Sequence, residues 1–143
     1  MATQFDRLWV DHLPDAIVLT TVEGHVVYWN KCADSLFGYS ASEAEGRFLL
    51  DLIVPADRRT DAAEQIAATL QLGSITRESV RCNKNGALIY VDMSHTVVPN
   101  SDGGGEFILF SYKDVTDIKV LRDARLVDAK FRNLLESMPD AIV

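Results

Sequence analysis

The chain has 143 residues, of which 48% are hydrophobic and 24% charged, a composition typical of one soluble globular domain with room for an extension. Its formal net charge of -7 comes with no clustered basic segment, which argues against nucleic-acid binding. Two cysteines, Cys32 and Cys82, are too few for a disulfide scaffold and too far apart for a metal knuckle.

The first elements form a β-hairpin followed by a short helix. Runs rich in β-branched and aromatic residues at 16–21 and 25–29 flank a glycine-containing turn. Asn30 then stands where a helix N-cap is expected, and Gly38 suits the left-handed residue that follows a helix. The pattern predicts strand, turn, strand and helix in this order.

Two more helices are predicted before the remaining strands. Ser40 and Glu43 have the spacing of a capping box, which predicts a short helix ending near Gly46. Pro55 suits the first turn of a longer helix that stops at Gly73. The apolar stripe predicted for this longer helix consists of Ala63, Ile66, Ala67 and Leu70.

Three further strands follow. They are expected at 75–82, 87–98 and 107–112, separated by an Asn-Gly turn at 83–86 and a glycine-rich loop at 100–105. Period-two alternation places one set of side chains of the second run on a single face: Ile89, Val91, Met93, His95 and Val97. The order predicts an α+β domain, with one five-stranded antiparallel sheet and short helices on one face.

The last part of the chain reads as a helix. From 117 to 138 there is neither glycine nor proline, and apolar residues recur at alternating spacings of four and three. This heptad seam comprises Val120, Ala124, Val127, Phe131, Leu134 and Met138. Because a lone amphipathic helix of this length is marginal in water, we expect it to form a coiled coil in a homodimer. The alternative is that the stripe packs back on its own domain.

A short repeat suggests how the chain is organised. The sequence PDAIV occurs at 14–18 and again at 139–143, before a predicted strand in the first case and after the helix in the second. We therefore expect the chain to be a fragment that stops as a second, tandem domain begins. The predicted division is an N-terminal cap segment at 1–12, a domain at 13–116, a helical linker at 117–138 and the truncated second domain at 139–143.

Several segments carry a family resemblance. The run 22–47 resembles the front half of a PAS domain, and 51–58 resembles the segment that enters its long helix. The run 81–98 resembles the last hairpin of that fold. Asp114-Val115-Thr116 is similar to the motif that closes a PAS domain and starts its output helix, and 131–143 resembles the start of another PAS domain.

The resemblance, which covers about Leu8 to Thr116, implies a non-enzymatic sensory domain that regulates a histidine kinase of a two-component system, a cyclic-dinucleotide enzyme or a similar output. It implies a pocket between sheet and helices. The candidate lining residues are Trp29, Leu36, Leu52, Ile66, Leu70, Val91, Met93, His95, Leu109 and Phe110. The signal is expected to pass through Asp114, Thr116 and the heptad seam, with Thr116 or Asp117 as the helix N-cap.

The ligand is not identified by the sequence. A flavin photoadduct of the LOV type needs an asparagine and a cysteine that are missing from 46–50, and Cys32 lies in the preceding helix. A histidine-ligated haem is also disfavoured, since no histidine lies between Pro55 and Gly73. A non-covalent flavin, with Trp29 stacked on it, or a small metabolite remains open. Core packing is the simpler role for Trp29, and an ordinary buried hydrogen bond is the simpler role for His95.

Other classes of function find little support. There is no phosphate-binding loop, nucleophile elbow, zinc-protease motif or clustered metal ligand, so we predict no catalytic residues and no metal site. No signal sequence or membrane-spanning run is evident, which favours a cytoplasmic segment without membrane contact. The alternative function is a ligand-free dimerisation module that holds effector domains in register through Phe5, Leu8 and Trp9.

Overall fold

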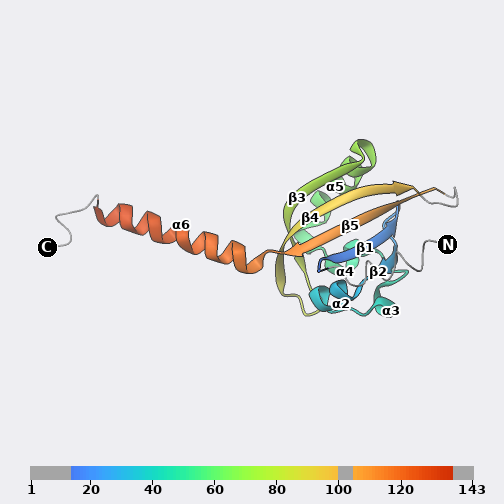
Figure 1. The fold of residues 1–143 in the computed structure, drawn as a ribbon, viewed down its shortest axis with the longest axis horizontal. Coiled ribbons are helices and arrows are strands. Elements are labelled where there is room, and N and C mark those ends of the chain that lie inside the picture. Colours follow the sequence, from blue (N-terminus) through green and yellow to red (C-terminus); the bar gives the residue numbers. More distant parts are fainter. Residues whose placement is uncertain (1–13, 100–104, 137–143) are drawn as a thin grey trace.

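One antiparallel sheet organises the domain. The computed structural model describes residues 14–99 and 105–136. The five strands are β1 (Ala16–Thr21), β2 (Val26–Trp29), β3 (Ser74–Cys82), β4 (Leu88–Pro99) and β5 (Glu106–Asp114). Their order in the sheet is β2-β1-β5-β4-β3, so the first and last strands of the domain pair in its middle (Figure 1).

The helices between β2 and β3 cover one face of this sheet. They are α2 (Lys31–Phe37), α3 (Ala41–Ala44), α4 (Leu49–Ile53), the 3₁₀ turn η1 (Ala56–Arg58) and α5 (Arg59–Leu72). A last helix, α6 (Thr116–Glu136), follows β5 directly and projects away from the sheet (Figure 1). The predicted α+β class, with its C-terminal helix, is confirmed.

Asn30 joins the hairpin to the first helix, as the sequence predicted. Its Oδ1 accepts hydrogen bonds from the backbone N–H groups of Ala33 and Ile17, each at 2.9 Å, while its Nδ2 donates to the carbonyl of Asp15 at 3.0 Å. Gly38 ends the helix with φ at 81°, in the left-handed region that favours glycine. The fully buried Asn30 amide is thus a structural cap.

The path between the capping box and the long helix differs from the prediction. The short helix α4 was not predicted, because four of its residues are buried and no polar face marks a helical period. Pro55 does not open the long helix. It precedes the 3₁₀ turn, and the α-helix begins at Arg59.

The predicted apolar stripe on α5 is wrong. Ala63, Ala67 and Leu70 are exposed, and Ile66 is only half-buried. The buried face is instead formed by Ala62, Gln65 and Thr69. Two polar side chains of this helix are therefore buried: the Gln65 oxygen accepts from Arg81 on β3, whereas the Thr69 hydroxyl donates to the Gln65 carbonyl of its own helix.

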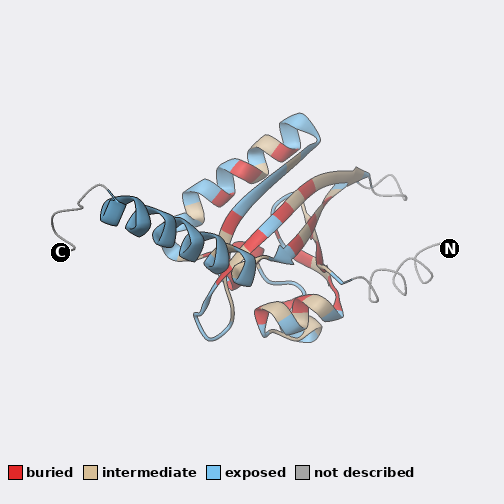
Figure 2. Ribbon diagram, turned by 60° about the vertical axis from the view of Figure 1, so that its left-hand side comes forward, coloured by how far each residue is buried: buried red, intermediate tan, exposed pale blue. Residues whose placement is uncertain are grey.

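The core lies between the sheet and the helices. Alternation along β4 is as predicted: Ile89, Val91, Met93 and His95 are buried, with Val97 half-buried. Figure 2 shows this alternation on the central strands, whereas α6 has no buried residue and is exposed beyond its first turn. Apolar residues dominate the core, but a group of polar side chains is buried with them: Thr20, Asn30, Gln65, Thr69, Ser79, Arg81 and His95.

Candidate functional site

The most unusual buried group is the guanidinium of Arg81. This residue lies on β3 with only 2% of its surface exposed. The strand register places it opposite Ile89, whose side chain faces the helices, so both project into the core. Within the described part of the chain no aspartate or glutamate forms an ion pair with Arg81. A cation is therefore buried without a compensating carboxylate, which is energetically costly.

The hydrogen bonds of Arg81 are unequal. Its Nη1 donates to the Ser79 hydroxyl at 3.0 Å and to the Val80 carbonyl at 2.8 Å. Its Nη2 has poorer acceptors, the Gln65 Oε1 at 3.4 Å and the Met93 sulfur at 3.3 Å, and its Nε has none within the described residues. One edge of the guanidinium is thus well satisfied, and the Nε/Nη2 edge is not.

His95 lies in the same core, on β4. It is 1% exposed, and neither ring nitrogen has a hydrogen-bond partner among the residues that the structure describes. Its ring meets that of Phe110, directly across on β5, at a centroid distance of 4.5 Å. Burial, together with the nearby charge of Arg81, lowers the pKa of His95 to about 4. The imidazole is therefore neutral at pH 7, with a free acceptor and a free donor.

Tyr112, on β5, is buried in the same core and packs against two other aromatic rings. Its ring stacks on Phe110 at 6.1 Å and meets Phe37 edge-on at 5.3 Å. Burial raises the pKa of Tyr112 to about 12, while the charge of Arg81 and its hydrogen bond to the phenol act in the opposite direction. The phenol is therefore uncharged, and it adds no anion to balance Arg81.

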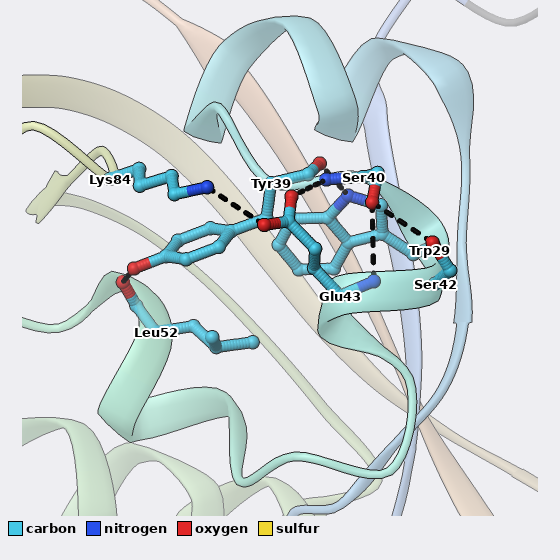
Figure 3. Close-up of polar contacts among 7 residues, drawn as sticks. All are labelled: Trp29, Tyr39, Ser40, Ser42, Glu43, Leu52 and Lys84. Atoms are coloured by element: carbon cyan, nitrogen blue, oxygen red, sulfur yellow. Dashed lines mark hydrogen bonds and ion pairs between the residues drawn. The ribbon is translucent and has the colours of Figure 1, made fainter.

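Tyr39 holds the helical cover in place. As Figure 3 shows, its carbonyl accepts from the Trp29 indole N–H at 3.0 Å, and its hydroxyl lies 3.3 Å from the Leu52 carbonyl, to which it donates. Beside its ring, the Lys84 ammonium pairs with Glu43 at 2.7 Å, linking the β3–β4 turn to α3. These contacts connect α3, α4 and the hairpin turn to one another and to β2 of the sheet.

A second feature is the junction between β5 and α6. The Val115 N–H donates to the Tyr90 carbonyl at 2.9 Å, and the Tyr90 N–H donates to the Thr116 hydroxyl at 3.0 Å. Asp114 accepts from the Thr116 N–H at 2.9 Å, while the Lys119 ammonium lies 5.7 Å from the centre of the Tyr90 ring. The predicted N-cap role of Thr116 or Asp117 is wrong, because α6 already begins at Thr116 and its hydroxyl binds β4 instead.

An open groove of about 210 Å³ lies beside this junction. It is lined by Arg58, Glu78, Ser79, Val80, Tyr90 and Lys119. Ser79 is shared between the groove and the Arg81 hydrogen bond, so the groove reaches the neighbourhood of the buried guanidinium. A second open groove, of about 140 Å³, is lined largely by polar residues of the three strands β3, β4 and β5.

The apolar seam of α6 is largely exposed over the residues that the structure describes. Val120, Val127, Phe131 and Leu134 are each more than half exposed, and Ala124 is also exposed. Near its start the helix touches the domain through Arg122, which lies 3.7 Å from Glu78. Met138 and the predicted interface residues Phe5, Leu8 and Trp9 lie outside the described residues.

The structure brings most of the predicted pocket residues to the core. Six of them are buried: Trp29, Leu52, Val91, Met93, His95 and Phe110. Leu36 and Ile66 are half-buried against this core. Leu70, at 43% exposed, points to solvent, and the half-buried Leu109 lies on the opposite sheet face from Phe110, because adjacent strand residues face opposite sides. These two residues do not line the interior.

Sequence reasoning missed Arg81, Gln65 and Thr69. A signal for Arg81 was present, since the Asn-Gly turn sets it opposite Ile89, and opposing residues share a face. For Gln65 and Thr69 the only signal was their spacing from Ala62, by three and seven residues. Hydrophobicity pointed to another stripe of the same helix.

The described residues offer neither a metal site nor a membrane-spanning helix. They contain no group of three or more histidine, cysteine, aspartate or glutamate side chains arranged to hold a metal ion. None of their helices combines the length and apolarity that crossing a bilayer requires.

Comparison with known proteins identifies the fold. The profile of a family described as "PAS domain" matches residues 14–117. The PAS domain of a protein from Colwellia psychrerythraea is 26% identical, with a TM-score of 0.71, and the match covers 82% of this chain and 99% of that one. The comparison with curated proteins found no match.

Two further solved structures show the same fold at lower identity. A domain of the sensory box sensor histidine kinase/response regulator from Geobacter sulfurreducens is 24% identical, with a TM-score of 0.64, over 78% of this chain and 93% of that one. A PAS domain from a two-component sensor histidine kinase is 16% identical, with a TM-score of 0.67, over 78% and 95% of the two chains.

Proposed function

This chain belongs to the PAS domain family, and on that premise we propose that it binds a small molecule in its core and relays the change through α6 to an effector domain. Domains of this family are regulatory sensory modules, and the similar structures include domains of sensor histidine kinases. The proposed output is a histidine kinase of a two-component system or a cyclic-dinucleotide enzyme elsewhere in a longer protein.

One observation carries the relay proposal. Tyr90 on β4 holds the start of α6 through both of its backbone groups, and the next core-facing residues on the same strand are Val91 and Met93. A ligand that displaces these side chains moves the strand that anchors the helix. Signalling requires such an element with two arrangements that the ligand favours unequally.

The exposed seam of α6 supports a dimeric output. Large apolar side chains along one helix face are stabilised when a second helix covers them. We propose that two copies pair along this seam in the cytoplasm and that the repeated PDAIV segment at 139–143 opens a tandem second domain. A non-covalent flavin or a small metabolite is the proposed class of ligand.

Native mass spectrometry of the purified chain tests ligand binding, and light scattering tests its oligomeric state. A small molecule that co-purifies at one copy per chain, in a dimer, is the expected result. Disulfide crosslinking between two copies of the Val127→Cys variant should then proceed at different rates with and without that molecule. Equal rates in the two states would contradict the relay.

The exposed seam also favours a second candidate, a ligand-free dimerisation module that holds effectors in register. Removing residues 1–12, which include Phe5, Leu8 and Trp9, separates the two functions. Loss of the dimer together with no bound molecule supports the second candidate. If the truncated and the full chain are both monomeric at high concentration, neither dimer proposal holds.

A further inference from the structure

Among the residues that the structure describes, no carboxylate balances the buried charge of Arg81. Arg81 is 2% exposed, no carboxylate pairs with it within the described residues, and the titratable neighbours His95 and Tyr112 are both uncharged at neutral pH. Arginine keeps its proton even when buried, so the charge cannot be relieved by deprotonation. A protein can tolerate this arrangement when a ligand supplies the counter-charge.

The free edge of the guanidinium defines what that ligand must offer. Nε and Nη2 together form the fork that receives the two oxygens of a carboxylate. In this structure Nε has no acceptor among the described residues, and Nη2 has the distant Gln65 oxygen and the Met93 sulfur. The Tyr112 phenol also hydrogen-bonds to the guanidinium, but it is uncharged and supplies no anion. A thioether is a weak acceptor. The edge best suited to a carboxylate is thus the edge that the protein leaves weakly satisfied.

We propose that the core of this domain binds a small molecule bearing a carboxylate, held by the Nε/Nη2 edge of Arg81, with its apolar body against Met93 and Phe110. This inference rests on the proposed sensory function and deepens it by naming the ligand class and the recognising residue. Met93 is flexible and can move aside to admit the carboxylate. The His95 imidazole, with both nitrogens unpartnered among the described residues, supplies a further donor or acceptor to the ligand.

The position of the site links it to the output helix. Displacing the Met93 sulfur from Arg81 changes a side-chain contact three residues along β4 from Tyr90, which anchors α6. On the other side of the guanidinium, Ser79 connects it to the groove that Lys119 of α6 also lines. Carboxylate binding at Arg81 can therefore affect α6 in two ways, through Met93 and Tyr90 on β4 and through Ser79 and the groove beside Lys119.

The test compares carboxylates with their neutral amides. The full 143-residue chain is titrated with benzoate, phenylacetate and hexanoate, and in parallel with benzamide, phenylacetamide and hexanamide. The resonance of the Arg81 Nε–H is followed by NMR, and the melting temperature is measured in the same samples. We expect at least one acid to shift this resonance and raise the melting temperature, at an affinity at least tenfold above that of its amide.

Variants identify the residue responsible. Arg81→Met keeps a side chain of similar length without the charge, and should retain the fold by circular dichroism while losing acid binding at least tenfold. Arg81→Lys keeps the charge but lacks the fork, and should bind more weakly than the unaltered chain. Arg77→Met, at an exposed position on the same strand, is the matched control and should bind normally.

The outcomes separate this inference from the proposed function. Equal binding of acid and amide, equal binding to Arg81→Met, or no response of the Arg81 resonance to any acid at millimolar concentration overturns the carboxylate site. A neutral molecule that co-purifies and binds equally well to Arg81→Met leaves the sensory function standing without this site. If a carboxylic acid binds but the crosslinking rate along α6 does not change, the carboxylate site is supported and the relay through α6 is contradicted.

Discussion

The backbone N–H of Tyr90, in β4, donates to the side-chain hydroxyl of Thr116, the first residue of α6, at 3.0 Å. The same Tyr90 accepts from the Val115 N–H at 2.9 Å. A strand that carries core side chains and a helix that leaves the domain are therefore joined by two hydrogen bonds at one residue. The ring of Tyr90 adds a contact with the Lys119 ammonium.

Replacing Thr116 by valine should weaken this junction. The change keeps the shape of the side chain but removes the acceptor, which leaves a partly buried N–H unsatisfied and lowers the free energy of unfolding by about 1–2 kcal/mol. Hydrogen exchange at the Tyr90 amide should accelerate. Thr116→Ser, which retains the hydroxyl, is the control, and equal exchange in both variants would show that the bond is not significant.

A second prediction concerns Gly24, in the β1–β2 turn. Its φ of +99° disfavours other residues, and a Cβ there would lie 2.7 Å from the Phe48 ring. Gly24→Ala should lower stability by about 2 kcal/mol, measured by urea unfolding. Gly86, with φ at +85° but open space around it, is the control, and Gly86→Ala should cost only about 1 kcal/mol. Equal costs would mean that the Phe48 ring moves aside freely.

The buried imidazole of His95 should make stability depend on pH. Its pKa is about 4 in the folded chain, chiefly through burial, against an ordinary value of 6.5 in the unfolded chain. Between pH 6.5 and pH 4 the unfolded state therefore binds more protons than the folded state. The contribution of His95 to the free energy of unfolding decreases as the pH falls through this window, and it is constant above pH 6.5. Across the whole window the free energy of unfolding should decrease by about 3 kcal/mol through this group.

The measurement is urea unfolding across this pH range, combined with NMR titration of the His95 ring protons. In His95→Leu, which has no titrating group at this position, the slope between pH 6.5 and pH 4 should decrease, while the slope contributed by carboxylates remains. An imidazole that titrates near 6.5 in the folded chain would show that water reaches the ring.

The seam of α6 can be tested by charge. Val127 is 67% exposed and lies in the middle of the seam, so Val127→Glu places a charge at each side of the proposed helix pair and should convert dimers to monomers in light scattering. Leu126, 55% exposed, neighbours it but lies off the seam, and Leu126→Glu is the matched control. Equal dissociation by both variants would argue for another interface.

Local chemistry predicted most elements of this fold, with α4 as the exception. Asn30, Gly38 and the Ser40–Glu43 capping box mark helix ends because their side chains or backbone freedom satisfy orphan backbone groups within a few residues. Alternation along β4 likewise predicted its core face. These signals depend only on near neighbours in the chain, so they could be read without the tertiary structure.

The orientation of α5 was decided by tertiary contacts. Its sequence offers a mostly apolar stripe through Ala63, Ile66, Ala67 and Leu70, yet the helix turns Gln65 and Thr69 inward. The side chain of Gln65 faces Arg81, which is 16 residues away along the chain and belongs to another element. A buried guanidinium requires polar neighbours, and this long-range requirement outweighs a weak local hydrophobic preference.

The sequence by itself thus determined the order of the strands and of the helices other than α4, the caps around Asn30, Gly38 and Ser40, and the heptad seam of the last helix. Only the tertiary structure decided which polar groups share the core, because packing brings Arg81, His95 and Gln65 together from two strands and a helix. It also decided that Thr116 bonds to β4 rather than capping its own helix. Both outcomes depend on distances across the sheet, which local patterns in the chain do not encode.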